Sequence, residues 1–366
     1  MFLRYSLFVF MCVVTVGSMI VTGCQNMQND PTTLTPTTAQ SGSFPSTDVG
    51  GTWALVDGNS SVVMYGSLAI STADVVTGGN WTEIGVTSGT FTGGTVSADS
   101  HGTISGTVST SVGTTHILSD GQMSLDKDLF IFAGTGNEAG IALRVNSSYE
   151  TADLAGTWSW VGLNSYGTIE VNTTGTIAGG TYTLVGGGSG IITSGTLAIT
   201  DQGTISGSFT TSEPIRLTIQ NGQMNSDKNV LYLACTSAPT LGNGVIIAIQ
   251  QGGSFTPGTD MAGIYQYISI TSYDSVAYGS ITVDGAGVVT GGNRTEIGVG
   301  SGTVTGGTLA LSTQGAITGS VSISSGNMHV LQSGQMNNSK TVAITVDRDN
   351  AAHTEMTVLV RAPLSL

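Results

Sequence analysis

Apolar residues alternate with Thr, Ser and Gly along most of the chain after residue 48, which is the pattern of β-strands with one buried face. Turn residues such as Gly93-Gly94 and Asp120-Gly121 interrupt this alternation. In the stretch up to residue 149, the pattern predicts eight short strands, at 51–56, 62–70, 75–84, 90–98, 103–109, 114–119, 128–133 and 140–145. Sequential strands joined by short turns most simply form an antiparallel meander.

The strand pattern belongs to a unit that occurs three times. The block beginning at Tyr65 matches blocks at Tyr166 and Tyr278 without a gap, at shifts of 101 residues (166 minus 65) and 213 residues (278 minus 65). The same two shifts still align three Gln-Met pairs and three lysines, at Gln122, Gln223 and Gln335 and at Lys127, Lys228 and Lys340. A register that holds over this distance indicates fixed strand lengths, so the Gln-Met motif is interpreted as structural.

Each copy opens with an Asp that is followed five residues later by an aromatic residue. These pairs are Asp48 with Trp53, Asp153 with Trp158, and Asp260 with Tyr265. The period exceeds the ~20–50 residues of solenoids and propellers, so each copy is expected to bury a core of its own. The predicted domains are repeat 1 at 48–149, repeat 2 at 153–251 and repeat 3 at 260–362.

The Gly-x-Trp at Gly51-Thr52-Trp53 resembles the start of the calycins, the group of lipocalins and avidins. In that group a Trp on the first strand is covered by a basic residue on the last strand. The resemblance assigns this closure to Trp53 with Arg144 and to Tyr265 with Arg361. In repeat 2 the basic position is taken by Gln250 or Gln251.

The predicted fold class is therefore all-β, with three tandem antiparallel meander units of about eight strands each. Closing a meander pairs its last strand with its first and removes exposed edges, which favours a calycin-like barrel. A β-sandwich of similar strand content is the alternative, and a continuous β-solenoid is a third possibility.

The N-terminus reads as an export signal, because Arg4 precedes an apolar run from Leu7 to Ile20 that is short for a transmembrane helix. Val21-Thr22-Gly23-Cys24 then resembles the lipobox of bacterial lipoproteins. The resemblance implies that residues 1–23 are a signal peptide and that Cys24 becomes the acylated N-terminus, with the membrane as its partner.

Residues 24–47 are rich in Thr, Pro and Ser and are expected to form an extended tether. Gln25 follows the cysteine, where an Asp tends to retain lipoproteins of Gram-negative cells in the inner membrane. The expected location is the cell envelope, with the outer membrane favoured if the source is Gram-negative.

The charge of the chain excludes one class of partner. It has nine Lys and Arg against 23 Asp and Glu, a net charge of −14, and its basic residues do not cluster. Binding to nucleic-acid phosphates is therefore not expected. Once the signal peptide is removed, Cys235 has no partner for a disulfide other than the acylated cysteine, so it is interpreted as a buried apolar residue.

No catalytic motif is recognisable, and neither a cofactor nor a metal is predicted. The four histidines lack the paired spacing of a zinc site. Asp126-Lys127-Asp128 and Asp347-Arg348-Asp349-Asn350 are acidic, but they lack the spaced oxygens of a calcium loop and each contains a cation. These two segments are interpreted as solvated turns.

One comparison between the copies points to a polar site. The gapless shifts align Glu83 with Leu184 and Glu296, and His116 with Leu217 and His329. Repeats 1 and 3 thus carry Glu with His where repeat 2 carries two leucines. Leu217 lies on the apolar face of an alternating strand, so all these positions are expected to point inward. A joint switch predicts contact between Glu83 and His116, as a core pair or as a ligand or proton-linked site, unless the agreement is a coincidence.

These observations predict a lipid-anchored cell-envelope protein whose tandem β domains act as a binding module or as a spacer of the adhesion type. The ligand would be an unidentified surface or periplasmic molecule. The alternative hypothesis is a carrier of small apolar ligands, with a calycin-like cavity in each repeat. An enzyme is not expected.

Overall fold

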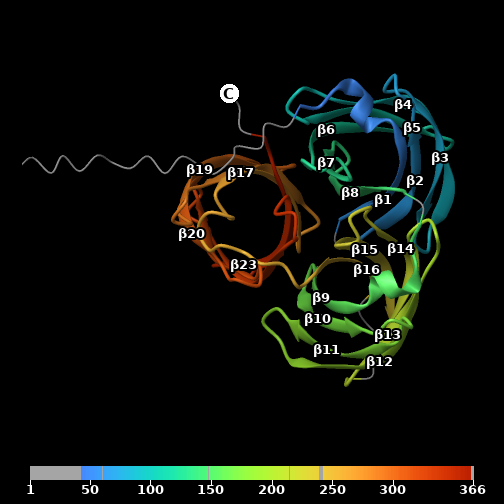
Figure 1. Cartoon of the computed structure of the whole chain (residues 1–366). Coiled ribbons are helices and arrows are strands. Elements are labelled where there is room, and N and C mark those ends of the chain that lie inside the picture. Colours follow the sequence, from blue (N-terminus) through green and yellow to red (C-terminus); the bar gives the residue numbers. More distant parts are fainter. Residues whose placement is uncertain (1–42, 60, 147, 214, 239–241, 364–366) are drawn as a thin grey trace, which may run out of the picture. The chain divides into compact units, whose positions relative to one another are not determined.

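The computed structural model describes residues 43–363, apart from residues 60, 147, 214 and 239–241. They form three closed antiparallel barrels of eight strands each, in simple meander order (Figure 1). The prediction of three tandem barrels is confirmed, and the sandwich and solenoid alternatives are wrong. The expected signal peptide, Cys24 and most of the tether lie outside the described residues. No helix in the described part of the chain is long and apolar enough to span a membrane.

The strand bounds repeat closely from barrel to barrel. Barrel 1 consists of β1 (Gly51–Gly58), β2 (Val63–Ile70), β3 (Val76–Glu83), β4 (Thr87–Ala98), β5 (Ile104–Thr110), β6 (Thr115–Met123), β7 (Leu129–Gly134) and β8 (Glu138–Arg144). Barrel 2 consists of β9 (Gly156–Gly162), β10 (Ser165–Val171), β11 (Ile177–Leu184), β12 (Ser189–Ile199), β13 (Thr204–Thr211), β14 (Arg216–Met224), β15 (Val230–Ala238) and β16 (Gly242–Gln250). Barrel 3 consists of β17 (Gly263–Thr271), β18 (Val276–Val283), β19 (Val289–Glu296), β20 (Gly300–Leu311), β21 (Ile317–Ile323), β22 (Met328–Met336), β23 (Val342–Asp349) and β24 (Thr354–Arg361).

In each barrel the first strand is paired with the last strand. The pairing brings together the aromatic and basic positions that the sequence analysis assigned to the barrel closure. Arg144 pairs with Trp53 in register, and its guanidinium lies 4.3 Å from the centroid of the Trp53 ring. Arg361 stands 5.3 Å over Tyr265 in the same way. In barrel 2 the residue at this place is Gln250, which donates a hydrogen bond to the Ala155 carbonyl.

A plug of short segments fills the same end of each barrel. In barrel 1 the 3-10 helix η1 (Ser46–Val49) buries Val49 against Trp53, whose Nε1 donates to the Val49 carbonyl at 2.8 Å. The 3-10 helix η2 (Thr151–Leu154) does the same for Trp158 in barrel 2. An ion pair ties each opening Asp to the repeated lysine at 2.7–2.8 Å, in the pairs Asp48–Lys127, Asp153–Lys228 and Asp260–Lys340. These contacts explain why both residues recur in every copy.

The repeated Gln-Met motif has a structural role. Gln122 Nε2 donates to the carbonyls of His101 and Met123, and Gln223 and Gln335 make the same two contacts in their barrels. The side-chain amide thereby satisfies backbone groups that the turn leaves unpaired.

Each barrel has an interior apolar cluster of its own. A fourth cluster is shared by all three barrels. Most of its members are outward-facing residues of the first strand and of the last two strands of each barrel. Tyr232, which is fully buried in this cluster, donates from its hydroxyl to the Leu55 carbonyl of barrel 1 at 3.2 Å. Each repeat thus has the core of its own that the sequence analysis expected, but it does not rely on that core alone. Both faces of these strands are buried, the inner face against residues of the same barrel and the outer face against the other two barrels.

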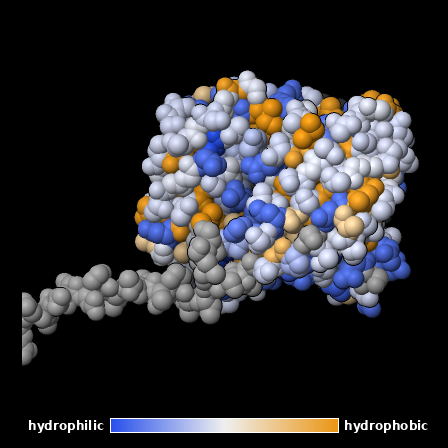
Figure 2. Space-filling model, turned by 90° about the horizontal axis from the view of Figure 1, so that it is seen from above, coloured by the Kyte–Doolittle hydropathy of each residue, from blue (hydrophilic) through white to orange (hydrophobic). Residues whose placement is uncertain are grey.

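The remaining outer surface is mixed in character. Figure 2 shows a face on which apolar residues lie singly or in small groups among polar ones. The large apolar residues that are most exposed, Val86 and Val299, occupy the same position in barrels 1 and 3. Isolated apolar residues of this kind are normal on a solvated surface.

Candidate functional site

The interior of barrel 3 is polar at the end opposite the Tyr265 plug. The outer face of β23 and β24 packs Val346, Met356 and Val358 into the shared cluster, so the residues between them point inward. These inward positions, together with those of β17, are Ser269, Thr271, Thr345, Asp347, Asp349, Glu355 and Thr357. The alternation that builds the barrel therefore also delivers charged groups to its inside.

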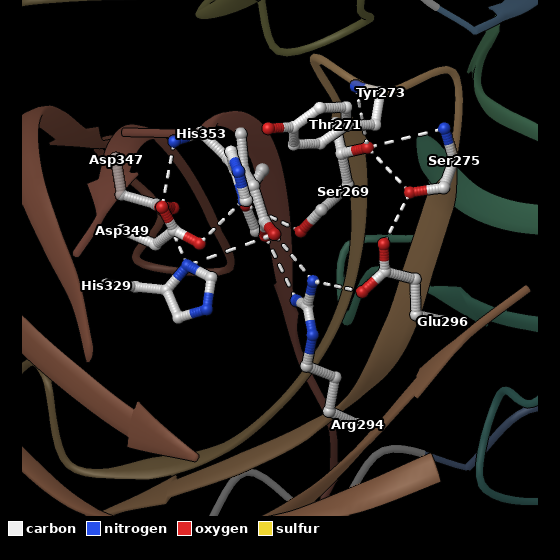
Figure 3. A network of polar contacts seen from close by, with 12 residues as sticks. Ser269, Thr271, Tyr273, Ser275, Arg294, Glu296, His329, Asp347, Asp349 and His353 are labelled. Atoms are coloured by element: carbon white, nitrogen blue, oxygen red, sulfur yellow. Dashed lines mark hydrogen bonds and ion pairs between the residues drawn. The ribbon is translucent and has the colours of Figure 1, made fainter. Parts of the chain in front are cut away.

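Arg294 lies at the centre of this polar network. From β19 it donates to both oxygens of Glu355, from Nη1 at 3.0 Å and from Nη2 at 2.5 Å, and Nη2 also donates to Glu296 at 3.3 Å. Glu296 additionally accepts from the Ser275 hydroxyl at 2.5 Å. Figure 3 shows Arg294, Glu296 and His329 directed toward one another inside the barrel. A fork of two hydrogen bonds holds both Glu355 and the guanidinium in a fixed orientation.

His329 extends the network on the other side. Its Nδ1 lies 2.9 Å from Asp347 Oδ1 and 3.9 Å from Glu355 Oε1. The residue is only 7% exposed, yet its Nε2 is buried and has no hydrogen-bond partner among the described residues. A buried ring nitrogen without a partner is costly, so a further hydrogen-bonding group at this atom would stabilise the site.

Burial and charge shift the protonation of these groups in a consistent direction. Burial by itself would lower the pKa of His329, but the hydrogen bond to Asp347 and the charge of Glu355 raise it above its ordinary value. Burial raises the pKa of Asp347 to about 6, against the lowering effect of the His329 hydrogen bond. Burial alone would lower the pKa of Arg294, and the charge of Glu355 outweighs it. Asp347 and His329 thus hold protons more tightly than they would in water.

Two cavities meet at this network. An interior cavity of about 60 Å³ lies on the plugged side and is lined mainly by apolar residues such as Tyr267, Ile281 and Leu309. A pocket of about 390 Å³ lies on the other side, at the mouth of the barrel. We call it the mouth pocket; its lining is Thr271, Tyr273, Arg294, Glu296, Val299, Gly300, Ser301, Gly302, Ile323, Ser324, Ser325, Asn327, His329, Asp349, His353 and Glu355. Arg294, His329 and Glu355 line both spaces, so they form the floor of the mouth pocket.

Barrel 1 carries a smaller version of the network. His116 Nδ1 lies 2.8 Å from Glu138 Oε2, and this hydrogen bond raises the pKa of His116. Asp57 is 6% exposed, and burial together with the charge of Glu138 raises its pKa well above the ordinary value. The cavity beside these residues measures only about 30 Å³.

The described residues of barrel 2 form no counterpart of the network. Leu184 and Leu217 pack against its interior cluster, and its cavity of about 20 Å³ is lined by apolar residues such as Trp158 and Phe209. The three barrels therefore grade from a packed apolar interior to one with a polar floor and a large mouth pocket.

The residues compared at the sequence level lie near these networks, although not as the direct pairs expected. Glu83 contributes a charge near Asp57, but the hydrogen bond of His116 goes to Glu138. In barrel 3, Glu296 and His329 are joined through Arg294 and Glu355.

The reason for the different partner is a change of hairpin length. Gly134 pairs with Glu138 in barrel 1, and Asp347 pairs with Glu355 in barrel 3. The shift between the barrels is 213 before the hairpin (347 minus 134) and 217 after it (355 minus 138), so the hairpin of barrel 3 is four residues longer. Glu138 and Glu355 thus occupy the same place, which a gapless comparison cannot align. The matching residue of barrel 2 is Gly244, which has no side chain.

The interpretation of the two acidic segments as solvated turns is wrong for their key residues. Asp347 is 5% exposed and lies on β23, and Asp128 is 3% exposed and accepts a 2.6 Å hydrogen bond from Asn225. Potential metal ligands come within 4.8 Å of one another in two groups of described residues, which are His329, Asp347 and Glu355, and Asp126, Asp128 and Asp227. A signal for Asp347 was present in the sequence, because Thr345 and Asp347 alternate with apolar neighbours on one strand.

A double-mutant cycle tests the pairing in barrel 1. His116→Leu and Glu138→Leu should be non-additive in the free energy of unfolding, by about 1 kcal/mol, because both side chains are partly exposed and solvent weakens the pair. His116→Leu with Glu83→Leu should be additive within about 0.5 kcal/mol. Urea denaturation of the three single and two double variants, beside the unchanged chain, measures both values. Coupling to Glu83 in place of Glu138 would contradict the geometry.

Comparison with known proteins leaves the function open. No protein-family model and no curated protein matches the chain. Solved structures with similar folds include transferrin-binding protein B of Haemophilus parasuis, at a TM-score of 0.30 and 10% identity, covering 87% of this chain and 77% of that one. Kievitone hydratase of Nectria haematococca matches at 0.23 and 12%, covering 91% and 94%, and a porin-like protein of Bacteroides uniformis at 0.19 and 10%, covering 89% and 100%. Likenesses this distant assign no function.

Proposed function

We propose that this protein is a lipid-anchored binding protein of the cell envelope, whose third barrel takes up a small polar ligand at its mouth. Barrels 1 and 2 serve as a folded spacer in this proposal. The proposal joins the lipobox-like N-terminus to the mouth pocket and the polar floor of barrel 3.

The observation that carries the proposal is the mouth pocket. Its volume of about 390 Å³ falls within the roughly 300–1,000 Å³ range of small-molecule sites. Its floor presents the Arg294–Glu355 pair and the partnerless Nε2 of His329. A concave space with a few convergent polar groups is the usual form of a binding site.

The carrier hypothesis, with an apolar ligand inside each repeat, is not supported by the interiors. The interior cavities of about 30, 20 and 60 Å³ are far smaller than the roughly 300–1,000 Å³ of small-molecule sites. The side chains of the barrels themselves fill the space that an apolar ligand would need. A polar ligand at the mouth fits the geometry better.

Blocking the mouth tests the binding role. Val299 lines the mouth pocket and is 74% exposed, so Val299→Trp should fill the pocket at little cost to the fold. Val86 has the same place in barrel 1 and is 70% exposed, which makes Val86→Trp the matched control. A library of neutral, anionic and cationic small molecules is screened against the full chain by ligand-observed NMR. Hits should weaken by at least about tenfold in Val299→Trp and remain in Val86→Trp; hits that survive both changes would place binding elsewhere.

The lipid anchor is tested separately. The proposal rests here on the sequence Val21-Thr22-Gly23-Cys24, and stable anchoring requires more than one acyl chain. Cys24→Ala should abolish labelling by a fatty-acid probe and release the chain from the membrane fraction. Undiminished labelling of the variant would remove the lipoprotein assignment without affecting the mouth pocket.

A further inference from the structure

The mouth pocket has an excess of negative charge. Its lining contains one guanidinium, that of Arg294, and three carboxyl groups, those of Glu296, Asp349 and Glu355. With the imidazoles neutral, the net charge of the lining is −2, and Asp347 lies directly behind it. The three negative charges of the lining face only one positive charge. This imbalance disfavours an anionic ligand and favours a cationic one.

The free atom of His329 specifies the kind of cation. When Nδ1 carries the proton that it donates to Asp347, the other ring nitrogen is left with a lone pair. Nε2 is on the opposite edge of the ring, turned away from Asp347 (Figure 3). It is buried and has no partner, so it calls for a hydrogen-bond donor. A ligand with N–H groups on a positive centre supplies both the donor and the charge.

The rim and the walls suit an organic ion. Tyr273 stands at the rim with 63% of its surface exposed, and its ring meets that of His353 edge-on at 4.0 Å. An exposed aromatic face attracts ammonium groups. Ser301, Ser324 and Asn327 line the opposite wall and offer neutral hydrogen-bonding groups to the rest of a ligand.

A bare metal ion fits this floor less well. His329, Asp347 and Glu355 are close enough to share a cation, but Arg294 donates to both oxygens of Glu355. A divalent ion at Glu355 would stand beside a fixed guanidinium and be repelled by it. A monovalent ammonium group near Glu296 avoids this conflict, because the Glu296 side chain is 23% exposed toward the pocket.

We propose that the mouth pocket of barrel 3 binds an organic ammonium ion, either a small amine or the ammonium end of a longer molecule. This inference rests on the proposed binding function and names the ligand class of the same site. Glu296 and the Nε2 of His329 receive the ammonium hydrogens, and the exposed ring of Tyr273 attracts the positive charge.

The test uses four probes of similar size on the full chain at pH 8, because a high pH favours the neutral form of His329, whose pKa is raised. Calorimetric titration is run with n-butylamine, 1,4-diaminobutane, n-butanol and butyrate, and separately with zinc chloride. The two amines should bind, and their affinity should fall as salt is added, because charge drives the contact. The alcohol of equal length and the anion should not bind.

Variants locate the binding. Glu296→Gln should weaken amine binding about tenfold, the effect expected for one hydrogen bond to a charged group. Glu83→Gln, at the same position in barrel 1, is the matched control and should leave the affinity unchanged. Tyr273→Ala should weaken binding about threefold and, being at the surface, serves if Glu296→Gln is poorly folded.

Each outcome decides a different statement. Three results would overturn the ammonium assignment while leaving a site at the mouth. They are equal binding of butanol, preferred binding of butyrate, and zinc binding that requires His329 in the absence of amine binding. Amine binding that ignores both Glu296→Gln and Tyr273→Ala would overturn it as well. If no probe binds and the Val299→Trp screen finds no hit, the proposed binding function itself fails.

Discussion

The melting temperature of this protein should be highest near about pH 4 and should fall as the pH rises to about 8. Burial and the charge of Asp126 raise the pKa of Asp128 from 3.8 to about 8, and burial raises that of Asp347 from 3.8 to about 6. Each group binds its proton more tightly in the folded chain than in the unfolded chain. The resulting stabilisation is complete below the unfolded pKa and is lost as the pH passes through the folded pKa.

The other titratable groups with shifted pKa values either also lower the stability as the pH rises or act only at a pH below this range. The pKa values of Asp57, His116 and His329 are also raised, so their contributions disappear with rising pH too. Asp153 and Asp260 have lowered pKa values, so the stability that they contribute is lost only at pH below their unfolded value of 3.8. Differential scanning calorimetry from pH 4 to 8.5 measures the profile.

A single replacement isolates the largest part of this effect. Asp128→Asn keeps the shape of the side chain and removes its titration, so it should raise stability at pH 8 by an amount on the order of a few kcal/mol and by much less at pH 4.5. Glu170→Gln, which alters an exposed carboxylate, is the control and should leave the profile unchanged. A wild-type melting temperature that rises from pH 5 to 8 would contradict the assigned burial of these carboxyl groups.

Tyr232→Ala should lower the free energy of unfolding by roughly 3–5 kcal/mol, the cost of removing a large aromatic side chain from a core. Tyr232 is fully buried in the cluster that all three barrels share, and its hydroxyl loses the contact with the Leu55 carbonyl. Guanidinium denaturation measures the change, with Tyr273→Ala as a surface control of equal chemistry.

The same variant tests how far the barrels depend on one another. If the shared cluster holds them together, Tyr232→Ala lowers the midpoint of unfolding for all three barrels, including those that do not contain the residue. A change confined to one of several separate transitions would show that the barrels unfold as independent domains, as the long repeat period alone had suggested.

The sequence predicts the strands well because most of them have one solvated face and therefore alternate. Its main boundary error is at β6, which was expected to end at 119 before Asp120-Gly121. In the structure β6 continues to Met123, with a register shift between Leu118 and Asp120. The same residue types occur at a bulge within a strand and at a turn between two strands. Composition alone therefore does not separate a bulge from a turn.

The shared cluster was missed although the sequence contained a sign of it. Leu129–Gly134 and Val342–Val346 are nearly continuous apolar runs, which is typical of strands buried on both faces. The repeat comparison drew attention to positions common to the copies, whereas this feature depends on the outer face of a few strands packing against other barrels. That packing is a long-range property and leaves no periodic trace.

Of the candidate site, the sequence yielded His329 and Glu296 but not Arg294, Asp347, His353 or Glu355. Arg294 aligns with Trp81 and Tyr182, so nothing in the repeat pattern marks it as polar. Glu355 follows the hairpin whose length differs, and Asp347 was hidden by the charged residues around it. A comparison of the three repeats finds joint substitutions only where the repeats align without a gap. This site includes residues on both sides of a hairpin whose length differs between the repeats.

The longer β23–β24 hairpin has a consequence for how such proteins acquire new specificities. Asp349 and His353 line the mouth pocket and lie in or beside the stretch that barrel 1 lacks. A copy of the unit can thus gain new side chains at one rim by a small insertion, while the ladder of hydrogen bonds beneath it stays intact. Transplanting the segment 348–354 between Gly134 and Glu138 would give barrel 1 a rim hairpin of the same length and charge as that of barrel 3.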